Sequence, residues 1–170
     1  DAALEAGVPC LCEKPFVAAG DAELGLQRVE AFRDAGLMLA ENCQWPYALS
    51  GFDTLYPGWR DQPVRSLTMR LSPAHPGRAM VEDSLSHVLS LLQALVPLSA
   101  DADVRSVVQS NASPDATTNV VRFDVIGGIG NIAVELHLEC CPRQPRPAWL
   151  AVNGARMDRE LGEDYAISFV

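Results

Sequence analysis

The fold of this chain is decided by the stretch Gly7-Val8-Pro9-Cys10-Leu11-Cys12-Glu13-Lys14-Pro15-Phe16. A short helical run precedes it, and Gly7 stands where a helix C-cap is expected. The apolar residues that follow predict a buried strand, which stops at a charged pair and a proline. Open α/β sheets bind ligands at the carboxyl ends of their strands. Because Pro15 disfavours helical geometry at Lys14, we expect the lysine to be presented on a turn at such an edge.

The residues after this turn predict one helix and one more strand. Asp21 can cap a helix that runs to about Ala35 and stops at Gly36. A short apolar strand, Leu37–Ala40, comes next. The expected apolar positions of the helix are Leu24, Leu26, Val29 and Phe32. Strand, helix and strand are typical of the end of a parallel sheet, so we expect residues 1–45 to be the C-terminal portion of a Rossmann-type domain.

The remainder, 46–170, predicts a second domain of the α+β class with a mainly antiparallel sheet that is open on one face. Two turn signals predict hairpins, Gly127–Asn131 and Asn153-Gly154. Helices are expected at about Tyr47–Tyr56 and Met80–Leu95, and strands at Val64–Leu71, Val104–Gln109, Val120–Ile126, Ile132–Leu138, Trp149–Val152 and Ala166–Val170.

The helix expected at Met80–Leu95 carries a candidate acid/base pair. Asp83 and His87 are one helical turn apart on one face, so the carboxylate can orient the imidazole and stabilise its charge. Ser90 and Ala94 share that side, opposite an apolar stripe of Val81, Leu85, Val88, Leu92 and Leu95. Such a pair suits general acid/base catalysis. The alternative is the solvated face of an amphipathic helix.

The order of these features resembles the Gfo/Idh/MocA family, the glucose-fructose oxidoreductase and inositol dehydrogenase group. The residues that carry the resemblance are the helix end Ala3-Leu4-Glu5-Ala6-Gly7, the strand, the turn Glu13-Lys14-Pro15 and the pair Asp83-x-x-x-His87. The resemblance implies that Glu13, Lys14 and Pro15 contact an NAD or NADP cofactor. It implies catalytic roles for Lys14, Asp83 and His87, with the histidine exchanging the proton of a substrate hydroxyl. Many members carry another acid where this chain has Ser90.

The resemblance implies an NAD(P)-dependent oxidoreductase that acts on a secondary alcohol or carbonyl of a sugar-like or polyol-like small molecule. It covers the later two-thirds or so of the family pattern, since the first strands and the glycine-rich turn of a complete member would come before Asp1. The 170-residue chain alone is therefore expected to be inactive. The alternative is a non-catalytic binding or assembly protein that keeps the sheet domain.

Composition excludes several other classes. The net charge of −9 argues against a nucleic-acid partner, which requires a basic surface. No segment approaches the roughly 20 apolar residues of a membrane span, and no secretory signal is visible, so we expect a cytoplasmic protein. The five cysteines, Cys10, Cys12, Cys43, Cys140 and Cys141, are odd in number and poorly spaced for disulfides or zinc, which favours buried, reduced thiols.

Two further motifs have simpler explanations than ligand binding. Gly128-x-Gly130-x-x-Ala133 resembles a dinucleotide fingerprint, but the residues after it alternate like a strand, whereas the fingerprint requires a helix. Glu135, His137 and Glu139 would share one face of that strand. Such a row is more often the polar face of a half-buried sheet than a metal cluster, so no metal site is expected. His75 lies between prolines in a loop and shows no evident partner.

The open face of the sheet is a candidate oligomer interface. Val121, Phe123 and Val125 alternate with Arg122 and Asp124, so the apolar side is expected to pack under the helices. The other side would expose Arg122, Asp124, Glu135 and His137. A face with both charge signs can pair with itself about a two-fold axis. The alternative is a solvated face, which antiparallel sheets tolerate.

Overall fold

The computed structural model describes residues 2–18, 20–98, 102–127, 130–164 and 166–170. It divides into two compact units, 1–44 and 45–170. Among the described residues, no helix is both long and apolar enough to cross a membrane. The cysteines are free thiols, as expected, but each is partly exposed rather than buried.

The first unit is a strand–helix–strand motif, as the sequence predicts. Its elements are α1 (Ala2–Glu5), β1 (Cys10–Glu13), α2 (Ala22–Asp34) and β2 (Leu39–Asn42). The two strands pair in parallel, with Cys10 opposite Leu39. Gly7 ends α1 in the left-handed region at φ 66°. Its N–H donates to the Leu4 carbonyl at 3.1 Å and the Val8 N–H to the Ala3 carbonyl at 3.0 Å, which is the Schellman arrangement.

The prediction that the first strand of this unit is buried was wrong, and most of the apolar positions named for its helix are exposed too. Leu11 of β1 is 69% exposed, and Leu24, Leu26 and Val29 of α2 are exposed as well, whereas Phe32 is buried at 5%. A parallel strand becomes fully buried only when helices cover both faces of its sheet. The described unit has two strands and one long helix, so it offers few neighbours to cover them. Asp21 stands at the N-cap of α2 but makes no capping hydrogen bond with its side chain.

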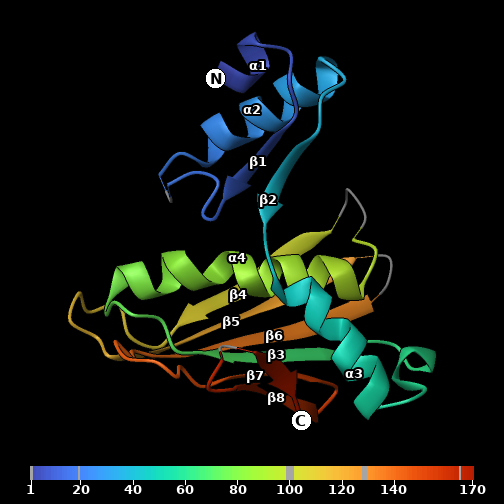
Figure 1. Ribbon diagram of the computed structural model, residues 1–170, viewed down its shortest axis with the longest axis vertical. Helices are drawn as coiled ribbons and strands as arrows, with labels where there is room; N and C mark the ends of the chain where they lie inside the picture. Colours follow the sequence, from blue (N-terminus) through green and yellow to red (C-terminus); the bar gives the residue numbers. More distant parts are fainter. Residues whose placement is uncertain (1, 19, 99–101, 128–129, 165) are drawn as a thin grey trace. The chain divides into compact units, whose positions relative to one another are not determined.

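The second unit is a layer of helices on a mainly antiparallel sheet, which confirms the predicted fold class (Figure 1). The sheet order is β4-β5-β6-β3-β7-β8-β9. The segment predicted as a helix at Tyr47–Tyr56 begins as a 3-10 turn and continues as α3. The elements are η1 (Trp45–Ala48), α3 (Leu49–Leu55), η2 (Trp59–Asp61), β3 (Ser66–Leu71), α4 (Arg78–Leu95), β4 (Asp103–Gln109), β5 (Thr118–Gly127), β6 (Gly130–Glu139), β7 (Ala148–Val152), β8 (Ala155–Leu161) and β9 (Ile167–Phe169).

The strand β3 lies in the middle of the sheet and pairs in parallel with β6. Its other neighbour, β7, runs antiparallel, as do the remaining pairs of the sheet. Leu67 and Met69 of β3 are fully buried, and Leu71 is 7% exposed. A parallel pair needs a long crossover between its strands. Here the crossover includes α4, which packs on β3 and β6.

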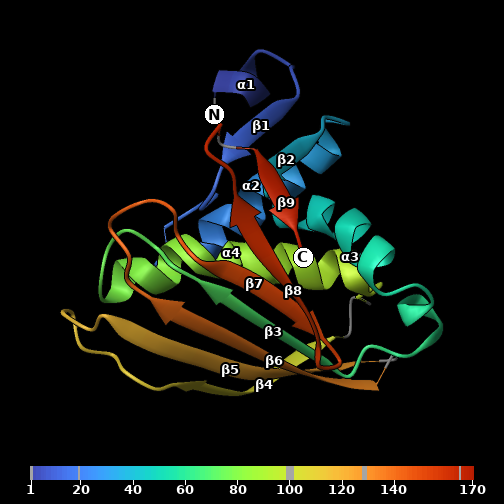
Figure 2. The ribbon, with the colours of Figure 1, turned by 60° about the horizontal axis from the view of Figure 1, so that its bottom comes forward.

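One face of the sheet is covered by α4, and the other carries no helix in the described part of the unit (Figures 1 and 2). The covered face is the apolar side predicted for β5 and β6. On α4, Val88 and Leu92 are buried as predicted, while Val81, Leu85 and Leu95 are only partly buried. The helix contributes three further buried residues, Met80, Ser84 and Leu91.

The two predicted hairpin connections join antiparallel strands. At the β7–β8 turn, Asn153 and Gly154 have φ values of 51° and 84°, as a type I′ turn requires. Between β5 and β6, Gly127 pairs with Gly130, while Gly128 and Ile129 lie outside the described residues. The segment from Gly130 onward belongs to a strand, so the described part of the glycine motif lacks the helix that a dinucleotide site needs.

Gly77 fixes where α4 begins, so its replacement should be costly. It has a φ of 69°, and a Cβ added there would lie 2.0 Å from the Pro114 carbonyl oxygen. Gly154 also has a positive φ, but an added Cβ would meet no atom within 4 Å. We expect Gly154→Ala to cost about 1 kcal/mol of stability from backbone strain alone. Gly77→Ala should cost at least about 3 kcal/mol, because a clash with backbone adds to the strain.

Urea denaturation of both variants measures this difference. A Gly77→Ala variant no less stable than Gly154→Ala would contradict the close approach of residue 77 to Pro114.

Candidate active site

The turn after β1 holds Glu13, Lys14 and Pro15 at the carboxyl end of the strand, as predicted. Two hydrogen bonds tie this turn to the neighbouring strand. The Asn42 side chain donates to the Glu13 carboxylate at 2.7 Å. On the far side of Lys14, the Phe16 N–H donates to the Glu41 carboxylate at 3.0 Å. Residues on both sides of Lys14 are therefore tied to β2, Glu13 through its side chain and Phe16 through its backbone, at an edge where parallel sheets bind ligands.

Glu41 and Asn42 are site residues whose role the sequence did not reveal. They stand at the end of β2, as Glu13 stands at the end of β1. The predicted parallel pairing of the two strands could have revealed them, because parallel strands end at the same edge of a sheet. Nearby, burial is the largest cause that raises the pKa of the Cys12 thiol, followed by the charges of Cys10 and Glu41. A raised pKa keeps this thiol protonated and unreactive at neutral pH.

Asp83 and His87 lie one turn apart in α4. The predicted spacing is therefore realised as one shared helical face. Asp83 is exposed, whereas His87 is partly buried and its Nδ1 atom is buried, so the prediction that both lie opposite the apolar stripe holds for Asp83 only. The Ser90 hydroxyl donates to the His87 backbone carbonyl at 3.0 Å. The structure thus brings Asp83 to His87 within one unit, and Glu13, Lys14 and Pro15 to one turn within the other.

The uncovered face of the sheet carries a network of paired charges. Arg122 of β5 forms an ion pair with Glu135 of β6, and the His137 Nε2 atom lies 3.4 Å from the same carboxylate. Burial alone would raise the pKa of Glu135, but the Arg122 hydrogen bond and the His137 charge lower it below its ordinary value of 4.5. Glu139 is held by Arg70. The described residues contain no group of three side chains that could hold a metal ion.

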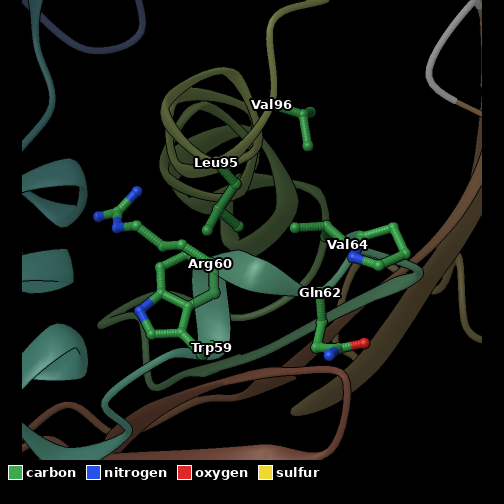
Figure 3. Close-up of a pocket in the computed structure, with 7 residues that line it drawn as sticks. Trp59, Arg60, Gln62, Val64, Leu95 and Val96 are labelled. Carbon is green, nitrogen blue, oxygen red and sulfur yellow. The ribbon is translucent and has the colours of Figure 1, made fainter.

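A pocket of about 410 Å³ lies at the C-terminal end of α4 (Figure 3). Leu95 and Val96 face Val64 across it, and Trp59, Arg60, Gln62 and Pro63 complete the lining. Leu95 is eight residues beyond His87, about 12 Å along the helix axis, so this pocket is separate from the acid/base pair. The Arg60 guanidinium is already bound by Asp53 at 2.7 Å.

Comparison with solved structures shows which proteins share this fold. The structure of an oxidoreductase from Pseudomonas syringae aligns with 99% of this chain, and the alignment covers 48% of the oxidoreductase (TM-score 0.62, 18% identity). For UDP-N-acetylglucosamine 3-dehydrogenase GnnA from Acidithiobacillus ferrooxidans, the alignment covers 99% of this chain and 58% of GnnA (TM-score 0.64, 16% identity). For the WlbA dehydrogenase from Thermus thermophilus, solved in complex with NAD and UDP-GlcNAcA, the alignment covers 92% of this chain and 54% of WlbA (TM-score 0.56, 16% identity).

The chain therefore has the fold of these oxidoreductases and dehydrogenases and spans about half of their length. The fold implied by the sequence resemblance is confirmed. No protein-family model and no curated protein matches the sequence.

The Arg122–Glu135 ion pair leads us to predict how the stability of the protein depends on pH. Because the folded-state pKa of Glu135 is below 4.5, the carboxylate contributes stability above that pH, and the contribution is lost as pH falls through the folded-state pKa. Arg122→Gln should raise the Glu135 pKa, so the loss should begin at a higher pH. Carboxyl NMR titration measures this pKa.

Arg156→Gln is the matched control for this titration. Arg156 is paired with Asp158 at 2.5 Å, and this substitution should leave the Glu135 pKa unchanged. An Arg122→Gln protein with an unshifted Glu135 titration would show that the ion pair is not formed in solution.

Proposed function

We propose that the complete protein is an NAD(P)-dependent oxidoreductase that transfers hydride between a nicotinamide cofactor and a secondary alcohol or carbonyl of a sugar-like or polyol-like substrate. The observation that carries the proposal is Asp83 and His87 on one face of α4, in a fold shared with oxidoreductases and dehydrogenases. Some of those structures contain NAD, which supports a nicotinamide cofactor.

His87 is the proposed general acid/base and Asp83 its positioning residue. During alcohol oxidation, the imidazole takes the proton of the substrate hydroxyl while hydride leaves the carbon that bears it. During carbonyl reduction, the protonated imidazole returns a proton to the oxygen. The Asp83 carboxylate orients the imidazole ring and stabilises its protonated form. The nicotinamide group, when bound, accepts or supplies the hydride.

Lys14 is the proposed link between cofactor and substrate. The carboxyl edge of a parallel strand pair is the usual ligand-binding edge of an open α/β sheet, and the Glu13–Pro15 turn lies at that edge. An ammonium group there can donate hydrogen bonds to a substrate oxygen and favour its developing negative charge. Glu13 and Pro15 hold the turn beside the cofactor in this proposal.

Removing the acid/base group should lower turnover without unfolding the protein. In the full-length enzyme, His87→Ala should lower kcat about a hundredfold to ten-thousandfold, because a general acid/base contributes that much. Lys14→Met should also lower kcat. His75→Ala, which removes an exposed histidine from a loop, is the matched control and should keep full activity.

The assay follows reduced nicotinamide with a panel of secondary alcohols, beside a thermal melt of each variant. Full turnover by His87→Ala would refute its role. No activity of the wild-type protein with any nicotinamide cofactor would favour the alternative, a binding or assembly protein.

We also propose that the complete protein forms homo-oligomers through the uncovered face of its sheet. Arg122, Glu135, Arg70 and Glu139 give that face both charge signs. Trp149 adds a large ring that is only partly buried and packs under the Arg156 guanidinium at 4.5 Å. A partner related by a two-fold axis would meet the same residues and could pair with them.

A charge-reversing substitution tests whether the uncovered face of the sheet is the oligomer interface. Arg122→Glu should shift the full-length protein toward monomer in light scattering at micromolar concentration, because it places a second acid beside Glu135 on both copies. Arg78→Glu is the matched control, since Arg78 is also exposed and also paired, but with Glu82 on α4. A monomeric wild-type protein would contradict the proposal, and equal effects of both substitutions would place the interface elsewhere.

A further inference from the structure

Two arginines, Arg146 and Arg159, differ from most others in having no acidic partner. Many of the described arginines form ion pairs with carboxylates, among them Arg33, Arg60, Arg70, Arg78, Arg105, Arg122 and Arg156. Arg146 and Arg159 form none with any described residue, although both are partly buried. In a chain of net charge −9, acidic groups are plentiful, so their absence here needs an explanation.

The two arginines are close neighbours. The Arg159 guanidinium donates to the Arg146 backbone carbonyl at 2.7 Å. Burial lowers the pKa of Arg159, and the positive charge of Arg146 lowers it further. The Nε atom of Arg146 is buried and has no hydrogen-bond partner among the described residues. Like charges in a partly desolvated place repel each other, so an anion bound between them would remove an unfavourable interaction.

The pair lies on the helix-covered side of the sheet. Arg159 is opposite Ala148 in the β7–β8 register, and the next inward pair is Met157 and Leu150, both buried in the core. The Arg159 guanidinium also lies 5.6 Å from the ring centroid of Trp45, which belongs to η1. That turn packs against α4. The arginines are therefore in the layer that contains α4, away from the open face proposed for oligomer contacts.

We propose that Arg146 and Arg159 bind the anionic group, a carboxylate or a phosphate, of a small-molecule ligand. Planar guanidinium groups bind both groups through paired, charge-assisted hydrogen bonds. Trp45 holds one guanidinium in place through a cation–π contact, so less rotamer freedom is lost when the anion binds. The Arg146 Nε–H is a further donor that has no partner among the described residues. The site is independent of hydride transfer and stands whether or not the proposed activity does.

Thermal melts of the full-length protein test this site without any measurement of turnover. Inorganic phosphate and acetate are the probes, each compared with sodium chloride at equal ionic strength. We expect at least one of them to raise the Tm of the wild-type protein more than chloride does, because an anion that binds only the folded state stabilises it. A rise with phosphate alone identifies a phosphate site, and a rise with acetate alone identifies a carboxylate site.

Substitutions connect the effect to the two arginines. Arg146→Gln and Arg159→Gln should each weaken the apparent affinity about tenfold to a hundredfold, which is typical when one charged hydrogen-bond partner is lost. Arg159→Lys, which keeps the charge near Trp45, covers the case in which Arg159→Gln does not fold. Arg143→Gln removes an equal charge from an exposed position in the same loop and should change nothing.

Two results would overturn the proposal. One is a wild-type Tm that rises no more with phosphate or acetate than with chloride. The other is an equal loss of anion stabilisation in Arg143→Gln, which would show that general charge, rather than the arginine pair, attracts the anion.

Discussion

The parallel pairing of β3 with β6 is the constraint on which the second unit depends. The chain leaves β3 at one end of the sheet and must return before β6 can run beside it, and α4 makes part of that return across one face. The apolar side of α4 must then face the sheet, so its polar side faces away. Asp83 is on that polar side because of this packing, and His87 lies beside it, partly buried at the edge of the covered side. Gly77 allows the start of the helix to approach residue 114 closely.

Charge is distributed differently on the two faces of this sheet. On the uncovered face, arginine side chains are paired with carboxylates: Arg122 with Glu135, Arg70 with Glu139 and Arg156 with Asp158. On the covered face, Arg146 and Arg159 have no carboxylate partner among the described residues, although burial makes unpaired charge more costly there. A paired surface can meet another copy with little electrostatic cost, whereas an unpaired, partly buried cation is suited to a ligand that brings its own negative charge. This contrast separates the proposed oligomer surface from the proposed anion site.

Local patterns predicted most of the secondary structure. The Gly7 helix end, the Asn153-Gly154 turn and the alternation of β5 and β6 each depend on neighbours in sequence, and each was confirmed. Burial of Leu11 was predicted wrongly, because it depends on which elements cover the strand, and one strand's sequence does not contain that information. The hydrogen bond between Asn42 and Glu13 and the unpaired arginines were missed for the same reason. They result from pairing between segments far apart in the chain, which periodicity does not encode.

A crystal structure of the full-length protein with NAD or NADP tests the central claim most directly. We predict that the nicotinamide ring lies at the carboxyl end of β1, in contact with the Glu13–Pro15 turn and with Lys14 beside it. A cofactor that binds elsewhere, with no contact to this turn, would contradict the account. So would the failure of either cofactor to bind at saturating concentration.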